Sequence, residues 1–125
     1  MVRLACSMIA LLMIISLTGC AATPSNYAAK YHTKAESIAL YESNEKPKGN
    51  FEFIKFIQSN SCDSKTFGRF AGNWDEAKLL LRLEAAMVNA DAITDYKCWT
   101  NAVDMVSNCW ASKRCEGNAI RFVEK

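Results

Sequence analysis

The chain has 125 residues, half of them apolar, with 15 lysines and arginines against 13 aspartates and glutamates. This length allows one small domain. The near balance of charge, with both signs interspersed, excludes the clustered basic surface that nucleic-acid binding requires, so no nucleic-acid partner is expected.

The N-terminal segment has the parts of a bacterial signal peptide. Arg3 precedes an apolar stretch at residues 4–17, which is shorter than the roughly 20 residues that cross a bilayer. It ends in LTGC (residues 17–20), which resembles the lipobox of bacterial lipoproteins in all four places. In proteins with this signal, cleavage precedes the cysteine, and the cysteine carries fatty-acyl chains such as palmitate. The sequence therefore predicts a signal peptide at residues 1–19 and lipidation of Cys20; an incidental cysteine in an uncleaved anchor is the alternative.

The residues after Cys20 indicate the cellular location of the protein and a tether. Ala21 stands where an aspartate would retain a lipoprotein in the inner membrane, so we expect an outer-membrane anchor in a Gram-negative cell. The attached domain would be periplasmic or partly surface-exposed. Residues 20–36 are small and polar, which predicts a lipid-anchored tether, and His32 is interpreted as a solvated residue of that tether.

The first half of the predicted domain, residues 37–125, reads as two strands and a loop. Residues 37–42 predict a short strand and residues 51–58 a second one, joined by a stretch rich in turn-forming residues. Residues 59–72 are rich in Ser, Asn, Asp and Gly, which predicts a long loop.

The second half predicts one helix and two strands. Asn73 is a candidate N-cap, with Glu76 three residues later as in a capping box, and apolar residues then recur at helical spacing up to Val88. Residues 92–99 and a segment around residues 119–123 predict the last strands. We therefore expect an α+β domain, with one main helix packed on a mainly antiparallel sheet of about four strands.

The cysteines predict cross-links. Of six cysteines, Cys6 lies in the predicted signal peptide and Cys20 at its end, which leaves Cys62, Cys98, Cys109 and Cys115. An even number in a small exported chain predicts two disulfides, and three connectivities are open. A zinc site is the rival, but the spacing contains no Cys-x-x-Cys unit, so no metal or other cofactor is expected.

The order of these four cysteines around one helix resembles the RcsF family of outer-membrane lipoproteins, which report envelope damage to the Rcs phosphorelay. The segments NADAI (residues 89–93) and NCWASKRCEGNAI (residues 108–120) also carry the resemblance. It implies the disulfide pairs Cys62–Cys109 and Cys98–Cys115. It further implies a signalling function through contacts with an outer-membrane barrel protein and an inner-membrane Rcs regulator. The family has a long proline-rich segment before its domain, whereas this tether is short and holds only Pro24.

The residue inventory favours binding over catalysis. One histidine in a tether and scattered carboxylates do not make an acid–base or metal site, so an enzyme is not expected. Lys113 and Arg114, expected in a short polar loop between two cysteines, are the candidate partner contacts. Trp74, Trp99 and Trp110 are of a residue type that dominates interfaces, although tryptophans near disulfides are more often part of a core. The alternative function is that of a lysozyme-inhibitor-type or structural lipoprotein.

Overall fold

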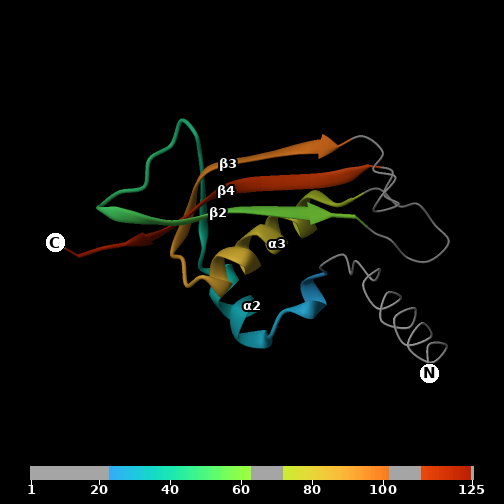
Figure 1. Cartoon of the computed structure of the whole chain (residues 1–125), viewed down its shortest axis with the longest axis horizontal. Coiled ribbons are helices and arrows are strands. Elements are labelled where there is room, and N and C mark those ends of the chain that lie inside the picture. Colours follow the sequence, from blue (N-terminus) through green and yellow to red (C-terminus); the bar gives the residue numbers. More distant parts are fainter. Residues whose placement is uncertain (1–22, 63–71, 102–110, 125) are drawn as a thin grey trace, which may run out of the picture.

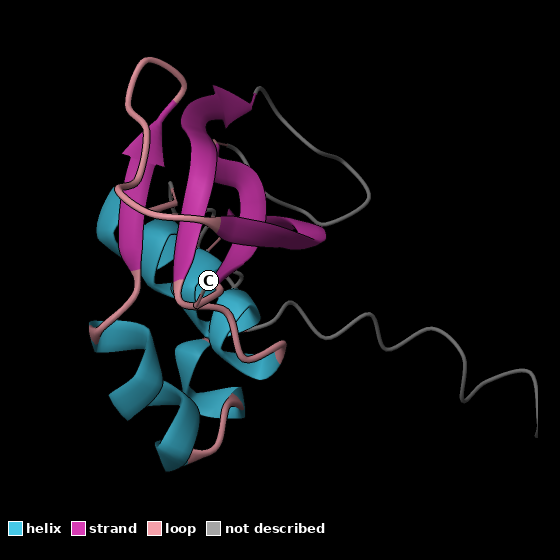
Figure 2. Cartoon of the chain, turned by 90° about the vertical axis from the view of Figure 1, so that its left-hand side faces the viewer, coloured by secondary structure: helices cyan, strands magenta, loops and turns pink. Residues whose placement is uncertain are grey.

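A mixed four-stranded sheet carries helices on one face (Figures 1 and 2). A computed structural model describes residues 23–62, 72–101 and 111–124 of the chain. The elements in chain order are the 3₁₀ turn η2 (Pro24–Asn26), α2 (Ala29–Glu36), β1 (Ala39–Glu42), β2 (Phe51–Ser61), α3 (Trp74–Met87), β3 (Ala92–Asn101) and β4 (Ser112–Phe122).

The strand order across the sheet is β1-β3-β4-β2. The β3–β4 and β4–β2 pairs are antiparallel, while β1 runs parallel to β3. The expectation of an α+β fold with four strands is therefore confirmed, and the sheet is mixed. The last strand of the chain does not close the sheet at an edge, because β4 lies between β2 and β3.

The core lies between α3 and the sheet. Its largest fully buried side chains include Leu80, Leu81 and Leu83 of α3, with Ile93 from β3 and Cys115 from β4. A buried hydrogen bond also joins the layers, because Ser59 Oγ on β2 donates to the Ala77 carbonyl oxygen at 2.7 Å. The apolar residues that recur at helical spacing along α3 thus form the side of the helix that packs against the sheet.

The start of α3 is fixed by the predicted N-cap. Asn73 Oδ1 accepts hydrogen bonds from the backbone N–H groups of Asp75 at 2.7 Å and Glu76 at 3.4 Å. In a capping box the Glu76 side chain would accept directly from the Asn73 N–H, but here the Ser61 hydroxyl stands between them. Ser61 Oγ accepts from the Asn73 N–H at 3.0 Å and donates to Glu76 Oε1 at 3.2 Å. The end of β2 therefore holds the first turn of α3.

The tether prediction is wrong for residues 24–36. This segment folds as η2 and α2, and α2 packs on α3. Tyr27, Tyr31, Ala35 and Ile38 recur every three or four residues and join the core, with Ala35 fully buried. Tyrosine and alanine are weakly apolar, which hides this helical period in the sequence.

Three polar contacts hold the N-terminal segment. Tyr27 Oη donates to Glu84 Oε1 of α3, and Lys34 Nζ forms an ion pair with Asp91 Oδ1 at 3.1 Å. His32 is half-buried, with Nε2 2.9 Å from the Pro24 carbonyl oxygen, so its interpretation as a solvated tether residue is also wrong. The expectation of one helix is corrected in the same way, since α2 adds a second helix to the fold.

The predicted loop at residues 59–72 begins later than expected. β2 continues to Ser61, because residues 59, 60 and 61 pair with Cys115, Arg114 and Lys113 of β4. These ladder hydrogen bonds outweigh the polar local sequence. Residues 63–71 lie outside the described part of the chain.

Candidate protein-binding site

The predicted contact residues lie at one end of the sheet, divided between its two faces. Here β2 and β3 end while β4 and α3 begin. A disulfide joins the neighbouring strands β3 and β4 at this end. We call this region the tryptophan end and define it by the residues that lie there on either face of the sheet, namely Trp74, Trp99, Lys113 and Arg114, with the Cys98–Cys115 bridge.

The disulfide joins positions that face each other in the β3–β4 ladder. Cys98 pairs with Cys115, and their Cα atoms lie 4.1 Å apart. Cys115 is fully buried and Cys98 is half-buried against the core, on the α3 side of the sheet. The Cys98–Cys115 pair that the resemblance implied is therefore confirmed.

Of the two cysteines in the second predicted bridge, one lies in the described part of the chain. Cys62 lies just after β2, is buried, and is disulfide-bonded. Cys109, the partner implied by the resemblance, lies outside the described residues. The pair Cys62–Cys109 stays a prediction.

Lys113 and Arg114 do not lie in a loop, as predicted, but on strand β4. Each is paired on both sides, since Lys113 faces Ser61 and Thr100 while Arg114 faces Asn60 and Trp99. The two side chains therefore point to opposite faces of the sheet. Pairing with two neighbouring strands overrides the turn-like local sequence.

On the helix side, Lys113 connects α3 to β3. Its ammonium nitrogen lies 4.7 Å from the centre of the Trp74 ring and donates to Thr100 Oγ1 at 2.7 Å. The Trp74 side chain keeps 38% of its surface exposed at the start of α3. An aromatic ring that is positioned by a cation and still reaches solvent suits contact with another molecule.

The face away from α3 carries a second polar and aromatic group. Register places Trp99, Arg114 and Asn60 side by side, and they line a cleft of about 260 Å³. Next along the same face, Glu116 accepts from Lys97 at 2.9 Å and from Gln58 at 3.0 Å. These two hydrogen bonds hold the pKa of Glu116 below its usual value.

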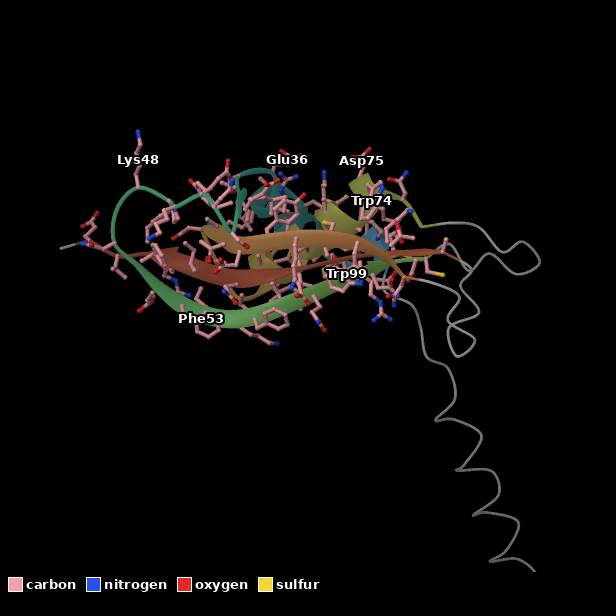
Figure 3. All side chains as sticks on the ribbon, turned by 90° about the horizontal axis from the view of Figure 1, so that it is seen from above. Glu36, Lys48, Phe53, Trp74, Asp75 and Trp99 are labelled. Carbon is pink, nitrogen blue, oxygen red and sulfur yellow. A yellow bond between two sulfur atoms is a disulfide. The ribbon has the colours of Figure 1, made fainter. Side chains whose placement is uncertain are left out.

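Phe53 lies on this open face as well, opposite to Trp74 and Asp75 (Figure 3). Its side chain is 63% exposed, and Phe51 and Phe56 of the same strand are also exposed. The aromatic residues of β2 are thus separated from the tryptophan end by the polar row of Gln58 and Glu116.

A larger cleft lies on the helix side of the tryptophan end. It measures about 660 Å³ and lies between the end of β1, the first turns of α3 and the middle of β3. Its lining residues are Glu42, Ser43, Asn44, Trp74, Lys78, Tyr96, Lys97 and Cys98.

Several of these residues were missed by sequence reasoning. Lys78 follows Trp74 by four residues on α3, so a shared helix face was readable from the sequence. Tyr96 gave no local signal, because its place in the cleft depends on where β1 ends beside β3. Of the predicted residues, Cys20, Cys109 and Trp110 lie outside the described ranges.

Within residues 23–62, 72–101 and 111–124, no group of three or more His, Cys, Asp or Glu side chains could hold a metal ion. No helix in those same ranges is both long and apolar enough to cross a membrane.

Comparison with known proteins adds a fold and no function. No model of a known family matches the sequence, and no curated protein does. A solved structure resembles this one with a TM-score of 0.51 and 16% sequence identity: a protein of unknown function of the DUF74 family from Pediococcus pentosaceus ATCC 25745. The similarity covers 70% of this chain and 99% of that chain. At this identity it bears on the fold alone, which is α+β.

Proposed function

We propose that the chain is an RcsF-like lipoprotein, anchored in the outer membrane through Cys20, that reports envelope stress to the Rcs phosphorelay by protein contacts. The observation that carries the proposal is the Cys98–Cys115 bridge, which is the second-to-fourth cysteine pair of that family. The LTGC signal at residues 17–20 supplies the anchor. The protein acts by binding and is not an enzyme.

The short connection to the lipid limits where the domain acts. The first element of the described part of the chain begins at Pro24, so residues 21–23 alone stand between that element and Cys20 in the sequence. Three residues span at most about 10 Å, so a lipid on Cys20 would keep the domain next to the membrane surface. A partner must come to it there: an outer-membrane barrel protein, or an inner-membrane regulator that reaches across the periplasm.

Fatty-acid labelling tests the anchor. Cells that express the chain are grown with radioactive palmitate, and the protein is recovered from separated inner and outer membranes. Cys20→Ala should lose the label and leave the outer-membrane fraction, while the matched Cys6→Ala variant should keep both. Label retained in Cys20→Ala would contradict the proposal.

Crosslinking in the periplasm tests the partner. The proposal expects a barrel protein and an Rcs-type regulator to be recovered, and expects Lys113→Glu and Arg114→Glu to weaken that recovery while the domain stays folded. Recovery of a lysozyme with neither of those proteins would instead favour an inhibitor.

A further inference from the structure

β3 extends further than the strand beside it. β1 is four residues long, and its last pair joins Glu42 to Tyr96. β3 continues to Asn101, and in the described part of the chain residues 97–101 pair with β4 alone. The second half of β3 therefore forms an edge of the sheet, which is the upper edge in Figure 1.

The register shows which backbone groups face that edge. The Cα separation of 4.1 Å between Cys98 and Cys115 is that of a non-hydrogen-bonded antiparallel pair. In such a pair each residue points its N–H and C=O away from its partner. The backbone groups of Cys98 therefore face outward, and those of Thr100, two residues further, do the same.

The larger cleft borders this edge. The end of β1 closes one side of it, and the Trp74 and Lys78 side chains of α3 form another wall. Lys97 is in an ion pair with Glu116 on β4, and Lys113 lies over the Trp74 ring. Lys78 has no ion pair with any described residue. The α3 wall thus offers an apolar ring and an available positive charge.

We propose that an extended segment of a partner protein binds here as an added strand beside residues 97–101, in line with β1. Backbone hydrogen bonds to Cys98 and Thr100 hold it, an apolar side chain packs on Trp74, and an acidic side chain faces Lys78. The inference rests on the proposed function in one respect only, that the domain acts by binding a protein; it does not depend on lipidation.

A displayed library of random 12-residue peptides, panned against the full-length protein in detergent, tests the site. The enriched peptides should alternate apolar and polar residues and contain an Asp or Glu. Thr100→Pro removes an outward N–H that β4 does not use, and loss of one such hydrogen bond should weaken binding about tenfold. Thr100→Ala is the matched control, because it removes the same hydroxyl group but keeps the N–H, and it should bind within about threefold of the parent.

A second pair of variants tests whether the positive charge of Lys78 contributes to peptide binding. Lys78→Glu should weaken the acidic peptides about tenfold, whereas Lys55→Glu, on exposed β2 at the opposite edge, should not. Circular dichroism confirms that each variant is folded. The proposal is overturned if no peptide is enriched, if binding survives Thr100→Pro, or if the occupant is a second copy of the chain by light scattering. A failed palmitate label with intact peptide binding would overturn the lipoprotein function and leave this site standing.

Discussion

The two halves of β3 belong to one strand but are held in different ways. Residues 92–96 lie between β1 and β4, Ala92 and Ile93 are fully buried, and Ile93 packs in the core with the helices. Residues 97–101 have β4 as their one partner strand among the described residues, and a disulfide fixes them there. Burial stabilises the first half, while a covalent bond stabilises the second. A cross-linked strand can keep an open edge for a partner without a larger core.

The largest expected effect is in the buried half. Ile93→Ala removes a fully buried side chain and should lower the free energy of unfolding by about 2–5 kcal/mol. Thr100→Ala, in the open half, should cost no more than about 1 kcal/mol. Urea unfolding of both variants measures the difference, and equal losses would show that the two halves are not held differently.

Removal of the disulfide should come next. The double variant Cys98→Ala with Cys115→Ala opens a link between residues 17 positions apart, which the chain-entropy model values at about 3 kcal/mol. Amide exchange should accelerate most at residues 97–101 and least at residues 92–94. Uniform acceleration along β3 would contradict the division into two halves.

Gly117→Ala tests the packing around the bulge where the two halves of β3 meet. Gly117 lies on β4 beside the bulge between Thr94 and Lys97, and an added Cβ would stand 2.5 Å from Ile93 Cγ2 and 3.0 Å from the Thr94 carbonyl oxygen. Overpacking of this kind should cost about 1–3 kcal/mol. Glu124→Ala, exposed beyond β4, is the control in the same thermal or urea measurement.

The elements with strong local signals were predictable from the sequence. The Asn73 cap and the apolar period fixed α3, and alternation with turn formers found β1 and β2. Helix α2 was missed because its buried residues are tyrosines and alanine. The parallel β1–β3 pair, the extension of β2 to Ser61 and the place of Lys113 and Arg114 on a strand arise from pairing over long sequence distances, which no local pattern reports.

The smallest expected effect is electrostatic. Hydrogen bonds from Lys97 and Gln58 lower the pKa of Glu116, so its carboxylate stabilises the fold above the pKa of the unfolded chain. That contribution is lost as the pH falls through the lower folded value. Glu116→Gln should therefore reduce the loss of stability at acid pH, by less than about 1 kcal/mol because the pair lies near solvent. Urea midpoints between pH 7 and pH 3 measure it, and an unchanged pH profile would contradict the assignment.

Amide exchange within the open half of β3 tests the central claim most directly. In the free full-length protein, the N–H groups of Cys98 and Thr100 point to the open edge, while those of Lys97 and Trp99 bond to β4. The account predicts alternation, with fast exchange at Cys98 and Thr100 and slow exchange at Lys97 and Trp99. Equal protection at all four amides would show that the edge is already covered in solution, and there would then be no open strand position for a partner to fill.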